Sequence, residues 1–365
     1  MIDPAVFYDA LCRLGLDFFT GVPDSLLQAL CACLYERAGK NYVIAANEGN
    51  AVGIAAGHYL AAGRPAVVFM QNSGIGNAVN PLLSLADPLV YRIPILLLIG
   101  WRGEPGTADE PQHKKQGLVT LSLLESMGIP ARIVDDAWED ALQEAAEQMR
   151  AGSIRALVIR KGTFSGYPLQ QAPCPFSMTR EHALSVILSC ISPGDLVAST
   201  TGKTSRELFE LRQAAGQGHA QDFLTVGSMG HASSIALGLS LATDKSVYCI
   251  DGDGAFLMHM GANAVNGCTG GENLKYILLN NGCHESVGGQ KTVGFQIHAE
   301  QILEGCGFPV YRAENEAQLR QGMRSLAAQK AALVVYTRPG SRTELGRPTT
   351  APEENKRCFM EAIQT

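Results

Sequence analysis

Two stretches of the chain, VYCIDGDGAF at positions 247–256 and LKYILLNNG at positions 274–282, decide the fold and indicate its chemistry. Each begins with an apolar run typical of a strand buried in a parallel sheet. Asp253 follows the first run and Asn281 follows the second, so both side chains are expected at the carboxyl edge of one sheet. Gly252 and Gly254 flank the carboxylate and would let the backbone approach phosphate oxygens closely.

This pair of turns supplies hard oxygen ligands. Mg²⁺ prefers six oxygens in near-octahedral geometry and usually takes some of them from phosphates. The Asp253 carboxylate, the Asn281 amide oxygen and a backbone carbonyl just beyond would form the protein's share of that shell. An acidic, glycine-rich turn is common by itself, but the two asparagines at this spacing favour a magnesium-diphosphate anchor.

Composition narrows the class of protein. A chain of 365 residues with 46% hydrophobic and 18% charged residues indicates a soluble globular protein of two domains. The net charge of −6, without a basic run, argues against nucleic acid as a partner. Uncharged stretches at 65–86 and 223–243 contain Asn, Ser and Gly, which favours core and site over a membrane span.

Ten scattered cysteines without a C-x-x-C pair fit a reducing compartment, and the acidic N-terminus is unlike a signal peptide. We therefore expect a cytoplasmic protein with no membrane partner.

The order of elements predicts α/β architecture, with two doubly wound parallel-sheet domains. Short apolar runs alternate with helical patterns in both halves. The halves share no detectable residue-level repeat, so a common fold would be a likeness of architecture alone. An uncharged segment with three prolines at 164–178 is expected to be an extended linker, giving domains 1–163 and 179–365. The expected strands are 18–20, 42–45, 66–70, 95–99, 196–198, 223–225, 247–250, 274–279 and 332–336.

Glu48 is the second informative acid. It follows a predicted strand and begins a helix rich in Gly and Ala, at 45–57. An acid at a helix N-terminus is favourable by itself, because it complements the helix dipole. A helix of such small residues is also suited to close packing against a ligand or a second subunit. Burial there would favour the protonated carboxyl, which suits Glu48 to sharing a proton with a ring nitrogen.

Several further residues have both a structural and a functional interpretation. Asp24 either caps a helix beginning at Ser25 or Leu26, or serves the site. His113 is either an exposed loop residue or a proton carrier. The turn at 200–205, TTGKTS, lacks the earlier glycine of a nucleotide P-loop, yet it can bind an anion or simply start a solvated helix. The candidate residues for binding a substrate anion are Arg102, Lys203, Thr204, Ser205, Arg206 and His284.

The chain as a whole resembles the phosphonopyruvate decarboxylases, a family of thiamine diphosphate-dependent 2-keto acid decarboxylases. The resemblance runs nearly end to end. It is carried by GVPDSLLQ (21–28), AANEGNAVGIAAG (45–57), DEPQHKKQG (109–117), STTGKTSREL (199–208), VGSMGHASSIALG (226–238), GDGAFLMHMGA (252–262) and NNGCHESVGGQ (280–290).

The resemblance implies specific roles. A pyrimidine-binding domain would come first and a diphosphate-binding domain second, in a homo-oligomer whose active sites lie between subunits. Glu48 would activate the cofactor through its pyrimidine ring, and Asp24 and His113 would handle protons. The Gly227 carbonyl would accept from the pyrimidine amino group, and Met229 would hold the cofactor bent. Mg²⁺ would bind Asp253, Asn281 and the Cys283 carbonyl.

The implied reaction converts 3-phosphonopyruvate to phosphonoacetaldehyde and CO2, in the biosynthesis of phosphonates such as 2-aminoethylphosphonate. Lys291 stands where the family pattern has proline, which bears most on substrate preference. Three alternatives remain: decarboxylation of sulfopyruvate, a carboligase reaction with a second keto acid, and a non-catalytic thiamine diphosphate-binding subunit.

Overall fold

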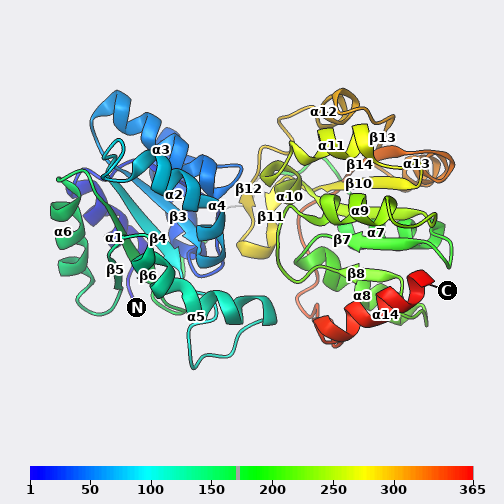
Figure 1. Ribbon diagram of the computed structural model, residues 1–365, viewed down its shortest axis with the longest axis horizontal. Coiled ribbons are helices and arrows are strands. Elements are labelled where there is room, and N and C mark those ends of the chain that lie inside the picture. Colours follow the sequence, from blue (N-terminus) through cyan, green and yellow to red (C-terminus); the bar gives the residue numbers. More distant parts are fainter. Residues whose placement is uncertain (170–172, 365) are drawn as a thin grey trace. The chain divides into compact units, whose positions relative to one another are not determined.

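The computed structural model describes residues 1–169 and 173–364, and these residues form two compact units, Met1–Gln171 and Ala172–Thr365 (Figure 1). Positions 170–172 of the predicted linker lie outside the described residues. The start of that segment belongs to the first unit, because Phe164 is buried and forms a parallel bridge with Ile2. No helix within the described ranges is long and apolar enough to cross a membrane.

The first unit contains a six-stranded, all-parallel sheet in the order β2-β1-β3-β4-β6-β5. Its strands are β1 Phe19–Gly21, β2 Tyr42–Ile44, β3 Ala66–Gln71, β4 Ile95–Gly100, β5 Ala131–Ile133 and β6 Ile154–Ile159. Its helices are α1 Pro4–Arg13, α2 Gln28–Arg37, α3 Glu48–Ala62, α4 Ile75–Pro81, α5 Pro111–Ser126 and α6 Trp138–Met149, with short turns η1 Gly39–Asn41, η2 Asn72–Gly74 and η3 Leu82–Ala86.

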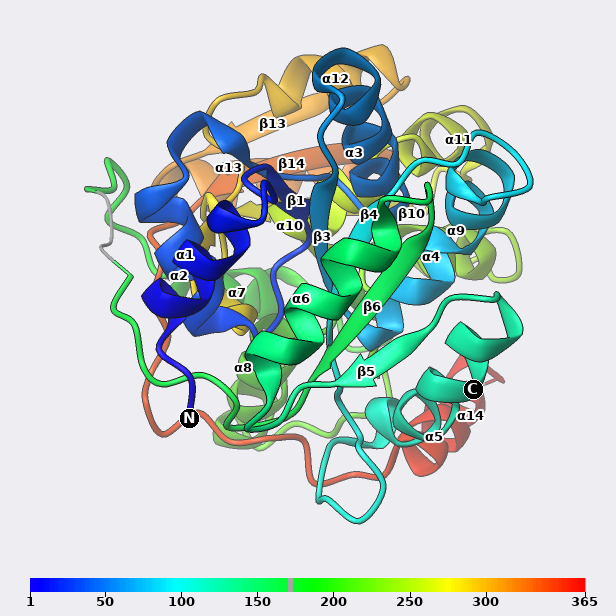
Figure 2. The same ribbon diagram turned by 90° about the vertical axis from the view of Figure 1, so that its left-hand side faces the viewer.

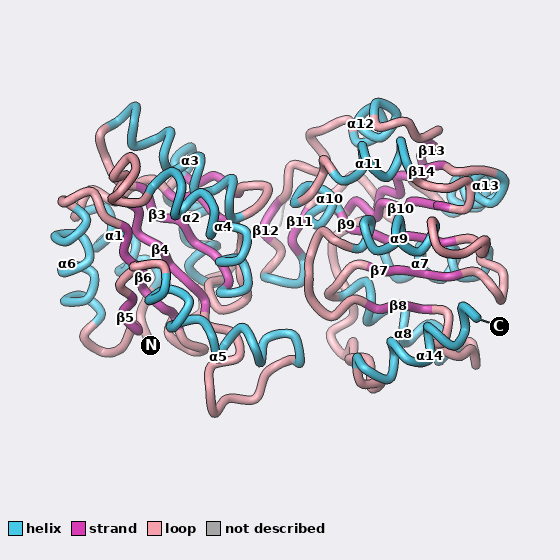
Figure 3. Tube along the Cα trace, viewed as in Figure 1, coloured by secondary structure: helices cyan, strands magenta, loops and turns pink. Residues whose placement is uncertain are grey.

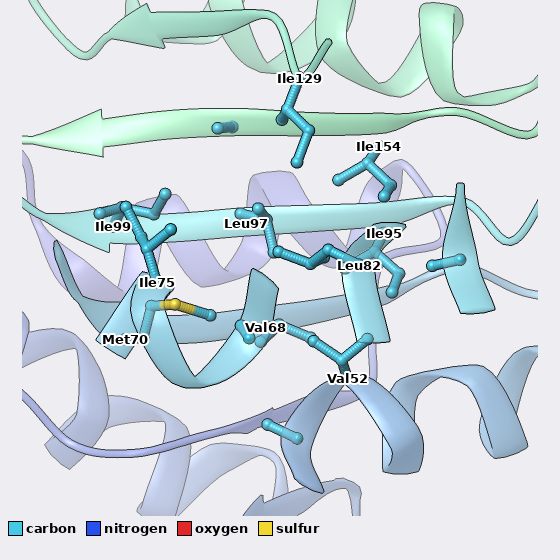
Figure 4. Packing of buried hydrophobic residues seen from close by; sticks show 14 of the residues in the cluster. Val52, Val68, Met70, Ile75, Leu82, Ile95, Leu97, Ile99, Ile129 and Ile154 are labelled. Atoms are coloured by element: carbon cyan, nitrogen blue, oxygen red, sulfur yellow. The ribbon is translucent and has the colours of Figure 1, made fainter. Parts of the chain in front are cut away.

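Helices cover both faces of this sheet, because its central strands are apolar on both faces. In β3, Val68 and Met70 join one core while Val67 and Phe69 join the other. Helices α3, α4 and α5 pack on the first face, where Val52 and Leu97 lie among the residues labelled in Figure 4. Helices α1, α2 and α6 pack on the second face, and α6 runs along β6 in Figure 2.

The second unit also contains a six-stranded parallel sheet, in the order β13-β14-β10-β9-β7-β8. Its strands are β7 Leu196–Ser199, β8 Asp222–Leu224, β9 Val247–Gly252, β10 Leu274–Asn280, β13 Val310–Ala313 and β14 Ala331–Tyr336, with an antiparallel pair β11 Cys283–His284 and β12 Gln290–Lys291. Its helices are α7 Arg180–Cys190, α8 Lys203–Ala214, α9 Ala232–Ser240, α10 Asp253–Met258, α11 Ala262–Thr269, α12 Ala299–Gly305, α13 Glu316–Ala328 and α14 Pro352–Gln364, with the turn η4 Glu285–Val287.

The two units have the same topology. When the main-sheet strands of each unit are counted in chain order, both sheets read 2-1-3-4-6-5. Figure 3 shows the strands of each unit lying between layers of helix. The predicted architecture of two doubly wound parallel sheets is therefore confirmed. In both sheets the topological switch point lies between the first and third strands, where such sheets bind ligands.

Some predicted elements were incomplete or wrong. The nine predicted strands are present with small shifts at their ends, but β5, β6, β13 and the short strands β11 and β12 were missed. The helix after β1 begins at Gln28, not at Ser25 or Leu26, so Asp24 does not cap it. The Asp24 carboxylate instead accepts a hydrogen bond from the Leu26 backbone N–H at 2.9 Å, which holds residues 24–27 in a turn.

Candidate active site

In the second unit, the predicted cofactor residues gather at the carboxyl ends of four adjacent strands. Gly227 and Met229 follow β8, Lys203 follows β7, Asp253 follows β9 and Asn281 follows β10. The chain turns sharply there. Gly202 has φ 94°, and Ser228, between Gly227 and Met229, has φ 50°, a left-handed conformation that is uncommon for a residue with a side chain. One sheet edge thus presents the loops that sequence analysis selected.

Asp253 is a buried carboxylate, with 3% of its surface exposed. It accepts a short hydrogen bond from the Thr292 hydroxyl, and the backbone N–H groups of Asn281 and Gly254 also point to it. Burial raises the pKa of Asp253 to about 6 despite these donors. No Lys, Arg or His among the described residues forms an ion pair with it. A cation would therefore be well accommodated at this carboxylate.

The backbone N–H of Asn281 points to Asp253, and two further hydrogen bonds hold the Asn281 side chain. Its amide oxygen accepts from the Cys283 N–H at 3.1 Å, and its amide nitrogen donates to Glu285 Oε2 at 2.9 Å. Burial raises the pKa of the Cys283 thiol to about 12, and Mg²⁺ prefers oxygen ligands to sulfur. The carbonyl is the atom that this residue can offer to a metal.

Glu285 connects the Asn281 turn to a buried ion network. It accepts from Arg180 Nη1 at 2.7 Å and from Lys203 Nζ at 3.3 Å. Arg180 in turn forms two 2.7 Å hydrogen bonds with Glu207. Burial alone would raise the pKa of Glu285, but Arg180 and Lys203 keep it below its ordinary value. The predicted anion ligand Lys203 is thus already paired with a carboxylate of its own chain.

The remaining candidates for a substrate anion lie nearby in the same unit. Thr204 and Ser205 are buried, and the Ser205 hydroxyl bonds to Ser199 Oγ and to the Thr200 carbonyl, each at 2.7 Å. Arg206 lies on the same turn of α8 and is half-buried. Burial lowers the pKa of His284 to about 4, so it would present a neutral imidazole rather than a cation.

Close packing at this edge leaves no room for larger side chains at two glycines. A Cβ on Gly254 would lie 2.7 Å from His284 Nδ1 and 3.1 Å from Met229 Cε. A Cβ on Gly294 would lie 2.8 Å from Asp253 Oδ2 and 2.7 Å from Asn280 Oδ1. Because Gly254 has no side chain, Met229 can pack against the turn that carries Asp253.

These residues fit a magnesium-diphosphate group. Two observations support the fit: the Asp253 carboxylate is buried without a cation, and the fully buried Gln290 amide has no hydrogen-bond partner for either of its polar atoms in the described structure. A buried polar group without a partner is costly, and a bound polar group would satisfy it. The described residues contain no cluster of three or more His, Cys, Asp or Glu that could hold a metal ion.

In the first unit, a second set of residues lies at the carboxyl ends of β1, β2 and β4. Glu48 is the first residue of α3 and is 5% exposed. Its carboxylate accepts from Asn77 Nδ2 at 2.7 Å, and a Cβ on Gly74 would lie 2.4 Å from it. Asp24 is fully buried and accepts from Gln71 Nε2 at 2.7 Å. Both acids are therefore held by amide donors, not by cations.

Arg102 and His113 meet at a residue that sequence analysis missed. The Asp109 carboxylate accepts from Arg102 Nε at 2.8 Å and from Arg102 Nη2 at 2.5 Å, and it contacts His113 Nδ1 at 2.8 Å. Arg102 Nη1 also donates to Ser25 Oγ at 2.7 Å. His113 is buried, not an exposed loop residue. Spacing could have identified Asp109, since it lies four residues before His113, whereas nothing in the sequence marks Thr292 or Gln290.

Comparison with known proteins identifies the family. Residues 4–123 match the N-terminal thiamine pyrophosphate (thiamine diphosphate) binding domain of thiamine pyrophosphate enzymes, and residues 200–336 match their C-terminal binding domain. The chain is 33% identical to a phosphonopyruvate decarboxylase of Streptomyces hygroscopicus, over 99% of this chain and 94% of that protein.

Two further relatives also match along nearly their whole length. A phosphonopyruvate decarboxylase of Streptomyces viridochromogenes is 33% identical, over 100% of this chain and 96% of its own. A sulfopyruvate decarboxylase of Methanosarcina acetivorans is 28% identical, over 96% and 94%. With both halves matched in order, the chain belongs to the family of thiamine diphosphate-dependent decarboxylases of the phosphonopyruvate and sulfopyruvate type.

Proposed function

We propose that this chain catalyses the Mg²⁺- and thiamine diphosphate-dependent decarboxylation of 3-phosphonopyruvate to phosphonoacetaldehyde and CO2, as a step in phosphonate biosynthesis. The observation that carries the proposal is the buried Asp253 carboxylate, which has Asn281 beside it and lacks a cation within the described structure. The choice of substrate is supported by the higher identity to phosphonopyruvate decarboxylases, 33% against 28%.

The second unit would bind the diphosphate, as the diphosphate domain at 179–365. Mg²⁺ would be held by Asp253, Asn281 and the Cys283 carbonyl, next to Gly252 and Gly254. The Gly227 carbonyl would accept from the pyrimidine ring, and Met229 would support the bend of the cofactor. When bound, thiamine diphosphate supplies the electron sink that the decarboxylation of a 2-keto acid requires.

The first unit would bind the pyrimidine ring, as the domain at 1–163. Glu48 would exchange a proton with that ring, and Asp24 and His113 would move protons at the reacting carbon. In a homo-oligomer, Glu48 of one subunit would serve the cofactor held by Asp253 of another. The ten cysteines are all free, which supports a reducing compartment such as the cytoplasm.

Two of the candidate ligands for the phosphonate already have partners within the chain. Arg102 and Lys203 have carboxylate partners inside the chain, so either would have to exchange partners to bind a substrate. We propose the α8 N-terminus, with Thr204, Ser205, Arg206 and neighbouring His284, as the region that receives the anion.

Stopped-flow measurement of CO2 release tests the substrate. With Mg²⁺ and thiamine diphosphate present, phosphonopyruvate should give a higher kcat/KM than sulfopyruvate or pyruvate. Faster turnover of sulfopyruvate would instead favour the second candidate, sulfopyruvate decarboxylase, which the Methanosarcina relative supports. A Glu48→Ala variant with full activity would refute the proposed role of Glu48, and an inactive wild type that binds the cofactor would favour a non-catalytic subunit.

A further inference from the structure

The Asp109 carboxylate has five hydrogen-bond contacts with its own chain. Besides the bidentate contact with Arg102, it accepts from the Gly103 N–H at 2.8 Å and the Glu110 N–H at 2.7 Å, and its side chain is 12% exposed. Its fifth contact is His113 Nδ1 at 2.8 Å. A single carboxylate therefore joins the loop after β4 to the first turn of α5.

The charge state of Asp109 decides which nitrogen of His113 carries the proton. Burial alone would raise the pKa of Asp109, but the hydrogen bonds from Arg102, His113 and two backbone N–H groups hold it well below its ordinary value. An ionised carboxylate can only accept hydrogen bonds, so His113 Nδ1 must be the donor. In the neutral imidazole, Nε2 then holds the lone pair. In the described structure, the hydrogen bond of the imidazole is the one made by Nδ1.

We propose that Asp109 is a positioning residue that fixes His113 in the Nδ1–H tautomer and leaves Nε2 as the nitrogen that exchanges a proton with the bound keto acid. The tautomer follows from contacts within the first unit alone. The proton exchange rests on the proposed function.

Arg102 holds Asp109 in place. Its guanidinium bonds to both carboxylate oxygens and to Ser25, while its backbone N–H and carbonyl both bond to the Asn72 side chain, at 3.2 and 2.8 Å. The Asp109 charge is thereby balanced by Arg102, whose guanidinium group and backbone are both held by hydrogen bonds. Arg102 consequently orients the Asp109–His113 pair.

The backbone around this pair is equally constrained. Gly103 has φ 67°, and a Cβ there would lie 2.0 Å from the His113 carbonyl oxygen. A loop that packs this closely on α5 keeps the distance between Asp109 and His113 short. Such support is what holds a proton-transfer group in one orientation.

Nitrogen NMR of the full-length protein labelled with ¹⁵N-histidine tests the tautomer directly. The chain has eight histidines, and the His113 signals are assigned by their loss in a His113→Gln variant. At a pH where the ring is neutral, Nδ1 should show the shift of a protonated nitrogen and Nε2 that of an unprotonated one. The reverse pattern would overturn the proposal, whatever the enzyme's substrate is.

An Asp109→Asn variant tests the consequence for catalysis. It should lose the tautomer preference and lower kcat by about 100-fold, the lower end of what a positioned acid or base contributes, with KM within about twofold. Asp136→Asn makes the same chemical change at an exposed position of the same unit and should leave both constants unchanged. Full activity of Asp109→Asn would refute the positioning role. Should this variant fail to fold, the NMR pattern of the wild type still decides.

The two proposals fail in distinguishable ways. A wild type that shows the Nδ1–H tautomer but turns over only sulfopyruvate or pyruvate contradicts the proposed substrate and leaves the Asp109 proposal intact. A wild type that decarboxylates phosphonopyruvate while His113 carries its proton on Nε2 supports the proposed substrate and contradicts the Asp109 proposal.

Discussion

The burial of the Asp253 carboxylate suits the binding of a cation, but it lowers the stability of the protein that has no cation bound. Its carboxylate is buried, and burial raises its pKa, because no cation among the described residues balances the charge. A buried charge of this kind is unfavourable until a counter-ion binds. We therefore attribute the burial of Asp253 to its proposed role as a cation ligand when the cofactor is bound.

Replacing Asp253 by Asn keeps the size of the side chain and removes the charge. We expect Mg²⁺-dependent binding of thiamine diphosphate to weaken by about 100-fold or more, since loss of even a supporting partner costs a metal site about 10- to 100-fold. Titration calorimetry measures this. Asp244→Asn, an exposed position in the same unit, is the control. Unchanged cofactor affinity in Asp253→Asn would show that the ligand set is wrong.

Gly294 offers a steric test of the same site. In a Gly294→Ala variant the new methyl group would lie within 3 Å of Asp253 Oδ2, Asn280 Oδ1 and Thr292 Oγ1, so one or more of them must move. We expect weaker Mg²⁺ binding and a loss of stability of about 1–3 kcal/mol from overpacking. Gly238→Ala in α9, where a methyl group meets nothing within 4 Å, should be neutral or slightly stabilising. Equal urea midpoints for both variants would contradict this prediction.

At the scale of elements, the edge strand β8 is held by side chains from two helices. Arg212 of α8 donates to both oxygens of the fully buried Asp222, at 3.0 and 2.9 Å. Asn355 of α14 donates to the Asp222 carbonyl at 2.8 Å and accepts from the Leu224 N–H at 3.3 Å. These contacts position the strand that leads into Gly227 and Met229.

Removing one partner of this buried pair should be costly. We expect Arg212→Met to destabilise the protein by about 3–5 kcal/mol, because Asp222 remains buried without its cation. The double variant Arg212→Met/Asp222→Leu should recover much of that loss. Urea unfolding of the two variants and the wild type provides the measurement, and equal stability of the single and double variants would refute the account.

Most of the strands that were predicted from sequence are buried and apolar, whereas two of the missed strands are partly exposed. Residues 247–251 and Leu274–Asn280 are buried, and apolar side chains fill most positions of both strands. Ala131–Ile133 and Val310–Ala313 are partly exposed strands at the ends of their sheets, so they carry little apolar signal. Ile154–Ile159 differs from those two, because it is apolar and largely buried, and its Arg155 stands where Lys275 stands in the predicted strand Leu274–Asn280.

The candidate residues that sequence could select most directly are those that follow a recognisable strand. Asp253 and Asn281 could be found because a recognisable strand precedes each of them. Thr292, Gln290 and Glu285 lie in the loop beyond, and their positions depend on how residues 283–291 form a short antiparallel pair. Sequence gives no period or spacing for such a loop. Likewise, the spacing between Asp109 and His113 suggests that these two residues pair, but the pairing of Asp109 with Arg102 is seen only in the structure.

At the scale of the whole molecule, each unit presents its candidate residues at the carboxyl edge of a sheet with the same strand order. Glu48 belongs to one such edge and Asp253 to the other. In the proposed homo-oligomer, each active site combines Glu48 of one subunit with Asp253 of another. A substitution at Glu48 therefore removes what a subunit contributes to one active site, and a substitution at Asp253 removes what it contributes to another.

This arrangement predicts that two inactive variants restore activity when their subunits mix. In a dimer of one Glu48→Gln subunit and one Asp253→Asn subunit, one site has both defects and the other has neither. Random exchange at equal amounts makes about half of the dimers mixed, so activity should recover to about a quarter of the wild-type value. The measurement is CO2 release after subunit exchange, with each variant alone as the control. If the mixture stays inactive after exchange has been verified, Glu48 and Asp253 must serve the same site from a single chain.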